Sequence, residues 1–174
     1  MTRITTGRLL LRPLAAGDAA ALVRELNNIE ISRWTARIPH PYGQADAADF
    51  IRQSATAGPG ALRLAIIRDG ELIGVIGLEG DEIGYWIAQS QWGKGFATEA
   101  ARAVADHAFL ARGAERLVAS YQTGNTASRC ILTGLGFREA GPGLGFCRAT
   151  GMETHIMALS LTREDWQAAR EQRI

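Results

Sequence analysis

A short glycine-rich turn, residues 92–97 with the sequence WGKGFA, has the residue types of an anion-binding site. It precedes a helical pattern, and the first backbone N–H groups of a helix have no partner within the helix. Glycines remove the Cβ atoms that would keep a bulky anion away, and they let successive N–H groups turn inward. The turn therefore predicts an anion site, and a diphosphate suits it best. A purely structural turn is the alternative.

Two common nucleotide-binding patterns do not fit this turn. The spacing GxxxxGK[ST] is absent, and GxGxxG fails because Thr98 occupies the position of the third glycine. A regulator that binds ATP or NAD through this turn is therefore a poor explanation of the sequence.

The elements on either side of the turn follow from hydrophobic periodicity. Apolar residues recur at i, i+3, i+4, i+7 and i+8 from Ala97 to Phe109, which predicts an amphipathic helix that ends near Gly113. β-rich segments at 81–89 and 116–122 flank this helix. A strand, a crossover helix and a strand predict that these two strands run parallel.

The remaining elements are predicted from caps, turn residues and periodicity. Asp69-Gly70 predicts a hairpin within residues 63–80, and Asp18 is expected to cap the first helix. The other predictions are a strand at 8–14, a loop or broken helix at 29–42, a helix at 44–57, a helix that leads into a strand over 125–137, a strand at 154–161 and a helix from Thr162.

Composition limits the class of protein. The 174 residues predict one domain over 1–174, with 47% hydrophobic and 21% charged residues. A net charge of +1 gives no footprint for nucleic acid. Cys130 and Cys147 have no metal or disulfide spacing, Cys130 is expected to be a small buried residue, and a cytoplasmic location is predicted. No segment predicts export or a membrane span, and no metal site is predicted.

Two longer motifs together resemble a known family. The segment "IGYWIAQSQWGKGFATEA", followed by "VASYQTGNTASRCILTGLGF", resembles the GNAT superfamily of acetyl-coenzyme A dependent N-acetyltransferases. With "RLLLRPL" near the start, the chain resembles the Rim-type branch, which acetylates the N-termini of ribosomal proteins. The resemblance covers residues 8 to about 161. It implies an α+β fold with a mixed, mostly antiparallel sheet of about seven strands, a splayed parallel pair and helices on both faces.

The resemblance also implies where acetyl-CoA binds. The family pattern [Q/R]-x-x-G-x-[G/A] matches at Gly95 and Ala97, whereas Trp92 replaces the polar residue, so main-chain N–H groups are expected to bind the diphosphate. Pantetheine is expected between the strand that ends at Ile87 and the strand near 117–120. The implied cofactor-binding residues are Ile87, Ala88, Trp92, Gly93, Lys94, Gly95, Phe96, Ala97, Thr98, Asn125 and Ser128.

Amide formation from a thioester needs a neutral amine, a polarised carbonyl and a proton for the departing thiolate. Glu82 is the first candidate for the base, with Glu153 and Glu79 as weaker ones, and the N–H near Ile87 is expected to stabilise the oxyanion. Ser128 matches the family position near the thioester sulfur and is the candidate acid. As alternatives, Glu82 is an ordinary hairpin carboxylate and Ser128 only decorates its helix.

The leading functional hypothesis is acetyl transfer from acetyl-CoA to a primary amine, either a protein N-terminus or a small molecule. The alternative is a non-catalytic acyl-CoA sensor with the same fold. Acceptor contacts are expected from the first two helices, the 29–42 loop and an irregular segment at 141–153. Tyr85 is interpreted as a core or cleft-lining residue, and a monomer and a homodimer are both compatible with the sequence.

Overall fold

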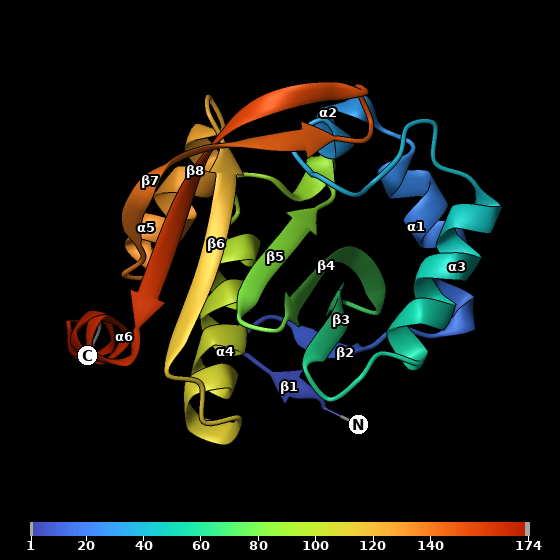
Figure 1. Cartoon of the computed structure of the whole chain (residues 1–174). Coiled ribbons are helices and arrows are strands. Elements are labelled where there is room, and N and C mark those ends of the chain that lie inside the picture. The colour runs from blue at the N-terminus through green and yellow to red at the C-terminus, as the bar shows by residue number, and fades with distance from the viewer. Residues whose placement is uncertain (1, 173–174) are drawn as a thin grey trace.

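The computed structural model describes residues 2–172, so the ends of the domain predicted over 1–174 lie outside the described residues. One eight-stranded sheet has the order β1-β2-β3-β4-β5-β6-β8-β7, and Figure 1 shows its elements. The strands are β1 (Ile4–Thr5), β2 (Leu10–Pro13), β3 (Ala61–Arg68), β4 (Glu71–Glu79), β5 (Glu82–Ile87), β6 (Arg116–Gln122), β7 (Arg138–Cys147) and β8 (Met152–Thr162).

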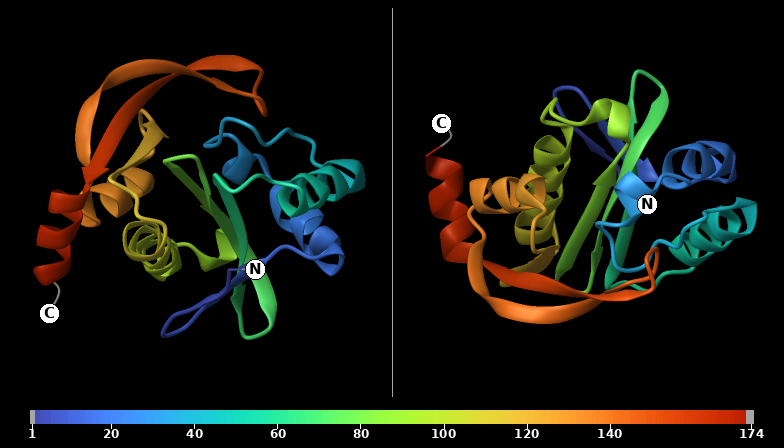
Figure 2. Two further views of the ribbon diagram at one scale, coloured as in Figure 1. Left: turned by 60° about the horizontal axis from the view of Figure 1, so that its bottom comes forward. Right: turned by 90° about the horizontal axis from the view of Figure 1, so that it is seen from above.

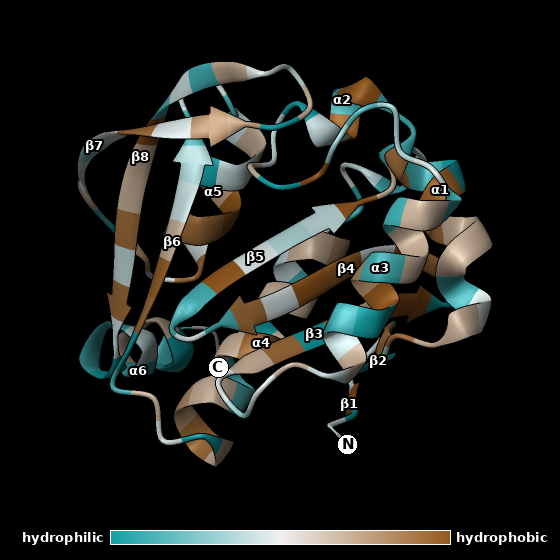
Figure 3. Ribbon diagram, turned by 45° about the vertical axis from the view of Figure 1, so that its right-hand side comes forward, coloured by the Kyte–Doolittle hydropathy of each residue, from teal (hydrophilic) through white to brown (hydrophobic). Residues whose placement is uncertain are grey.

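Helices cover both faces of the sheet, as predicted (Figure 2). The α-helices are α1 (Ala19–Leu26), α2 (Ile29–Ser32), α3 (Gln44–Ala55), α4 (Phe96–Ala111), α5 (Thr126–Gly134) and α6 (Arg163–Glu171), with short 3₁₀ helices η1 (Ala16–Asp18) and η2 (Gln89–Gln91). In Figure 3 the hydrophobic colour is concentrated on central elements such as β4, whereas α6 is largely hydrophilic.

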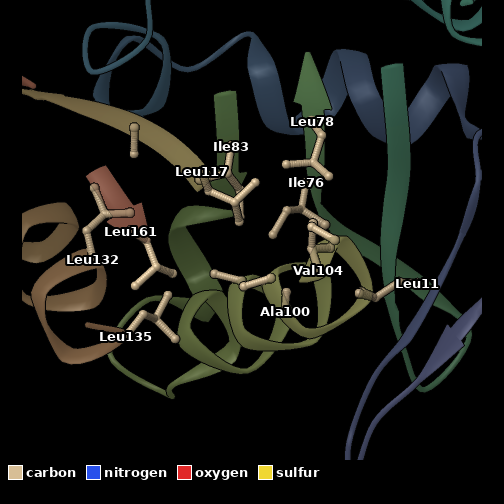
Figure 4. Packing of buried hydrophobic residues seen from close by; sticks show 14 of the residues in the cluster. Leu11, Ile76, Leu78, Ile83, Ala100, Val104, Leu117, Leu132, Leu135 and Leu161 are labelled. Carbon is tan, nitrogen blue, oxygen red and sulfur yellow. The ribbon is translucent and has the colours of Figure 1, made fainter. Parts of the chain in front are cut away.

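Two hydrophobic clusters, one on each face, hold these layers together. On one face, α4 packs Ala100 and Val104 against strand residues such as Ile76, as Figure 4 shows. On the other face, α1 and α3 cover a cluster that includes Leu22 and Trp86. The helical periodicity of residues 97–109 is therefore confirmed, because its apolar stripe is the buried face of α4.

The parallel pair β5–β6 is confirmed, and it separates almost at once. Glu82 opposite Val118 is the one residue pair of its register, and the Val118 N–H donates to the carbonyl of Asp81 at 2.9 Å. Beyond this pair the two strands run in the same direction and diverge toward their C-terminal ends (Figure 1). All other neighbouring strands are antiparallel.

Three expectations need correction. The sheet has eight strands rather than about seven, because the two-residue β1 has too little pattern to be recognised. The 141–153 segment is not irregular, since β7 pairs with β8 from Arg138 to Cys147. Asp18 does not cap α1 with its side chain. Instead, its carboxylate accepts the Ala15 N–H at 2.8 Å and pairs with Arg12 at 2.8 Å.

Candidate active site

The glycine turn joins β5 to α4 in the conformation that an anion site needs. Gly93 and Gly95 have φ values of 73° and 79°, in the left-handed region that favours glycine. α4 begins at Phe96, so the N–H groups of its first turn have no helical acceptor. Two positive-φ glycines and a helix N-terminus therefore converge at the end of β5.

Side chains fix the turn without occupying this N-terminus. The Trp92 indole N–H donates to the Ile87 carbonyl at 2.8 Å, which ties the turn back to β5. The Lys94 ammonium donates to the Ser90 carbonyl at 2.7 Å and to Gln91 Oε1 at 3.1 Å. At the position where the family pattern has Gln or Arg, the Trp92 side chain therefore stabilises the turn by a hydrogen bond to the backbone.

The N-terminal hairpin braces the turn from outside. Arg8 donates to the Lys94 carbonyl at 2.9 Å and pairs with Glu99 at 2.7 Å. The guanidinium groups of Arg8 and Arg68 each lie 4.6 Å from the ring centroid of Phe96, which is 2% exposed. These contacts hold the start of α4 in place.

A groove of about 1120 Å³ lies beside the Arg8 contacts. Its lining includes Gly95 and Thr98 but neither Asn125 nor Ser128, so it is not the place of the reaction.

Ser128 lies in the first turn of α5, where Asn125 caps the helix. The Asn125 Oδ1 accepts the Ser128 N–H at 3.1 Å, the usual hydrogen bond of an asparagine at a helix N-cap. Any hydrogen bond that Asn125 donates to a ligand would come from its amide N–H groups.

The Ser128 hydroxyl lies 3.1 Å from the hydroxyl of Tyr85 on β5. Burial raises the pKa of Tyr85 to about 12, although the hydrogen bond to Ser128 opposes this shift, so the phenol is protonated at neutral pH. The sequence interpretation missed this partner of Ser128. Strand alternation places Tyr85 on the same face as Ile83 and Ile87, but it does not show which helix covers that face.

Glu82 lies where β5 and β6 separate. It is an exposed residue opposite Val118, and alternation places its side chain on the face of Gly84 and Trp86, opposite to Tyr85. No atom lies within 4 Å of the position that a Cβ would occupy at Gly84. The structure therefore leaves open space on the sheet beside Glu82 and does not place this carboxylate next to Ser128.

The two weaker base candidates have different surroundings. Glu79 forms an ion pair with Arg63 at 2.6 Å, whereas Glu82 has no ion pair within residues 2–172. Glu153 is on β8, opposite Phe146 in the distal part of the β7–β8 hairpin. The geometry thus favours Glu82 among the three carboxylates.

The 29–42 segment and the β7–β8 hairpin meet on the open side of the sheet. The Cys147 thiol lies 3.5 Å from the Arg33 carbonyl, and the Arg148 N–H donates to the Ala36 carbonyl at 3.1 Å. A Cβ at Gly124 would lie 3.9 Å from the Trp34 ring. Trp34 therefore reaches the turn that leads into α5, so these segments form a rim around the separated strands.

One simpler prediction is wrong. Cys130 is exposed rather than buried, because it lies on the outer side of α5. Residues 2–172 contain no cluster of metal-ligating side chains. None of the helices in the same range has the length and apolar character required to cross a membrane.

This fold, with a separated parallel pair and a glycine turn at a helix N-terminus, is that of an acyl-CoA-dependent acetyltransferase. Residues 8–138 match the family model described as "Acetyltransferase (GNAT) domain", and the chain belongs to this family. It is an acetyl-CoA-dependent N-acetyltransferase, which transfers an acetyl group from acetyl-CoA to an amine.

Relatives and solved structures agree with this assignment. The chain is 28% identical to the Bacillus subtilis protein named "Putative ribosomal N-acetyltransferase YdaF", over 92% of this chain and 93% of YdaF. It is 32% identical to "Uncharacterized N-acetyltransferase YoaA" of the same organism, over 79% of this chain and 84% of YoaA. The structure of Mycobacterium smegmatis RimJ in complex with CoA-disulfide superposes with a TM-score of 0.82 and 26% identity, over 97% of this chain and 89% of RimJ.

Proposed function

We propose that the diphosphate of acetyl-CoA binds the main-chain N–H groups of residues 93–98 and that its pantetheine arm enters between β5 and β6. The observation that carries this proposal is the separation of these strands directly after Glu82 and Val118. Strand backbone that has no neighbouring strand can pair with the amides of pantetheine. The proposal assigns cofactor contacts to Ile87, Ala88, the 92–98 turn, Asn125 and Ser128.

In this arrangement the amine attacks the thioester directly. Glu82 removes a proton from the amine through a chain of water molecules, because about three residues of strand, or roughly 10 Å, separate Glu82 from Tyr85 along β5. The Ile87 N–H stabilises the oxyanion, and Ser128 gives a proton to the departing sulfur. The amine approaches from the open face beside Gly84, whereas Ser128 acts from the face that α5 covers.

We propose a protein N-terminal α-amine as the acceptor. An α-amine with a pKa near 8 is neutral in about one molecule in ten at pH 7, whereas a lysine is neutral in about one in a few thousand. The similarity to YdaF, whose name includes ribosomal N-acetylation, supports this choice. Small-molecule amines are the alternative acceptors. The unpaired Cys130 and Cys147 are consistent with a cytoplasmic enzyme.

Thiol release with a panel of N-terminal peptides and small amines tests the proposal. Near pH 7, Glu82→Gln should lower kcat/KM about 100-fold, with recovery as pH rises and the amine loses its proton unaided. Glu71→Gln is the matched control. Glu71 is an exposed carboxylate at the start of β4, whereas Glu82 lies opposite Glu79 at the end of that strand.

Two outcomes would contradict the proposal. Unchanged turnover in Glu82→Gln would remove Glu82 from the mechanism. Release of no thiol with any amine, despite tight acetyl-CoA binding, would favour the sensor alternative.

A further inference from the structure

The contact between Tyr85 and Ser128 joins two elements that are fixed independently. Tyr85 is opposite Ile76 in the β4–β5 register, and Ser128 is held in the first turn of α5 by the Asn125 cap. The 3.1 Å between their hydroxyl oxygens is a hydrogen-bond distance. Neither element needs this bond to form, so the contact calls for an explanation beyond local folding.

We propose that Tyr85 is a positioning residue that donates its hydroxyl hydrogen bond to Ser128 Oγ, so that the hydrogen of Ser128 points to the thioester sulfur. Each hydroxyl carries one hydrogen, and in a hydroxyl pair only one of the two lies between the oxygens. If Tyr85 donates, the hydrogen of Ser128 is available to a third group. Within residues 2–172 the Ser128 hydroxyl has no other hydrogen-bond partner.

The relative acidity of the two groups sets the direction of this bond. Burial raises the pKa of Tyr85 to about 12, but an aliphatic hydroxyl such as that of Ser128 is a weaker acid still. The phenol is therefore the stronger acid and the better donor. The phenol is protonated at neutral pH, so it can donate this bond to Ser128 Oγ.

The chemical step balances with Tyr85 as the second proton donor, and it rests on the role proposed for Ser128. The amine nitrogen forms a bond to the carbonyl carbon, the C–S bond breaks, and its electron pair goes to sulfur. The Ser128 proton moves to sulfur while the Tyr85 proton moves to Ser128 Oγ. Solvent returns a proton to Tyr85, and the amine proton leaves through Glu82. The products are an amide and free thiol.

A structural strut is the competing explanation of the same contact. A strut would hold α5 against β5 and would affect protein stability or cofactor affinity, with no effect on the chemical step. The relay instead lowers kcat and leaves the KM for acetyl-CoA unchanged. The two explanations therefore differ in a measurable quantity.

The test is a double-mutant cycle on kcat with Tyr85→Phe, Ser128→Ala and the double variant. Each single change should lower kcat about tenfold or more at unchanged KM for acetyl-CoA. The double variant should match Ser128→Ala within about twofold, because Tyr85 acts only through Ser128. Tyr121→Phe is the matched control, since it removes a tyrosine hydroxyl that donates to Glu139.

The possible failures are distinguishable. An unchanged kcat in Tyr85→Phe, a change confined to KM, or multiplied losses in the double variant would overturn the role of Tyr85 alone. An unchanged kcat in Ser128→Ala would overturn the proposed proton donor as well. A readout without variants is the single-turnover rate of the native enzyme in H2O/D2O mixtures. A curved dependence is expected from two protons in motion, and a linear one would contradict the relay.

Discussion

At the scale of single residues, the glycines around α4 combine a structural with a functional requirement. Gly93 precedes the helix and Gly113 follows it, with φ values of 73° and 69°. At neither position does any atom lie within 4 Å of a Cβ built on the backbone. Both positions therefore require a positive φ, but only Gly93 belongs to the proposed diphosphate site.

This similarity gives a matched pair of substitutions. Gly93→Ala and Gly113→Ala should each lower the free energy of unfolding by about 1 kcal/mol, because alanine is strained at positive φ. Only Gly93→Ala should weaken acetyl-CoA binding, by about five- to tenfold, since a methyl group there obstructs the approach of a phosphate. Urea unfolding and calorimetry measure the two effects. Equal acetyl-CoA affinity in the two variants would contradict the assignment of the turn.

The candidate site was predictable where its residues act through local backbone. The turn at 92–97 and the Asn125 cap depend on neighbours in sequence, and the structure has both features. Tyr85 was not predictable, because its partner Ser128 is 43 positions away and on a different element. The face of a strand can be read from alternation, but the helix that covers this face cannot.

At the scale of elements, Asp18 connects β2 to the start of α1. Its carboxylate pairs with Arg12 of β2 at 2.8 Å and accepts the Ala15 N–H at 2.8 Å. Asp18 is 6% exposed, and the hydrogen bond from Arg12 is the main cause that lowers the pKa of this carboxyl, against the opposing effect of burial. The pair therefore stabilises the folded state in a pH-dependent way.

Asp18→Asn should lower the free energy of unfolding by about 2 kcal/mol at pH 7, because it leaves the Arg12 charge without its partner. The folded-state pKa is below the unfolded value of about 3.9. The stabilisation is therefore complete above pH 4 and is lost as pH falls through the folded pKa. The difference in the free energy of unfolding between the native protein and Asp18→Asn should narrow over this pH range. Chemical unfolding from pH 7 to pH 2 measures this difference.

The control for this substitution is Asp49→Asn, since the ion pair between Asp49 and Arg52 is mostly exposed and should contribute less than about 0.5 kcal/mol. A gap of constant size down to pH 2 would show that the charge of Asp18 does not cause the stabilisation.

Element predictions succeeded where a local signal exists. Asp69 and Gly70 have φ values of 50° and 85°, as a two-residue hairpin turn requires. A strand was predicted after the helix that begins near 125, but its continuation through 141–147 was missed because the glycines there suggest irregular structure. In the sheet, Gly143 and Gly145 give room to Ile156 of β8, whose side-chain atoms lie 3.6 Å and 3.1 Å from the Cβ positions at these glycines. That requirement arises from strand pairing, which periodicity within β7 does not report.

At the scale of the whole molecule, the sheet consists of two halves with one parallel residue pair between them. Strands β1–β5 form one half and β6–β8 form the other, with Glu82 opposite Val118 at the junction. α4 packs against both halves, and the β7–β8 hairpin contacts the 29–42 segment. A cofactor arm between β5 and β6 would therefore join the two halves. At 100 times its Kd, a ligand that binds only the folded state raises the free energy of unfolding by about 2.7 kcal/mol.

Titration calorimetry of the native protein with acetyl-CoA and with acetyl-pantetheine tests the central claim most directly. Both ligands carry the thioester arm, but only acetyl-CoA carries the diphosphate that the N–H groups of residues 93–98 are proposed to bind. The account predicts saturable binding of acetyl-CoA and at least 100-fold weaker binding of acetyl-pantetheine. Similar affinities for the two ligands would contradict the account. So would no association of acetyl-CoA at about 1 mM, a concentration that detects any binding of about 4 kcal/mol or stronger.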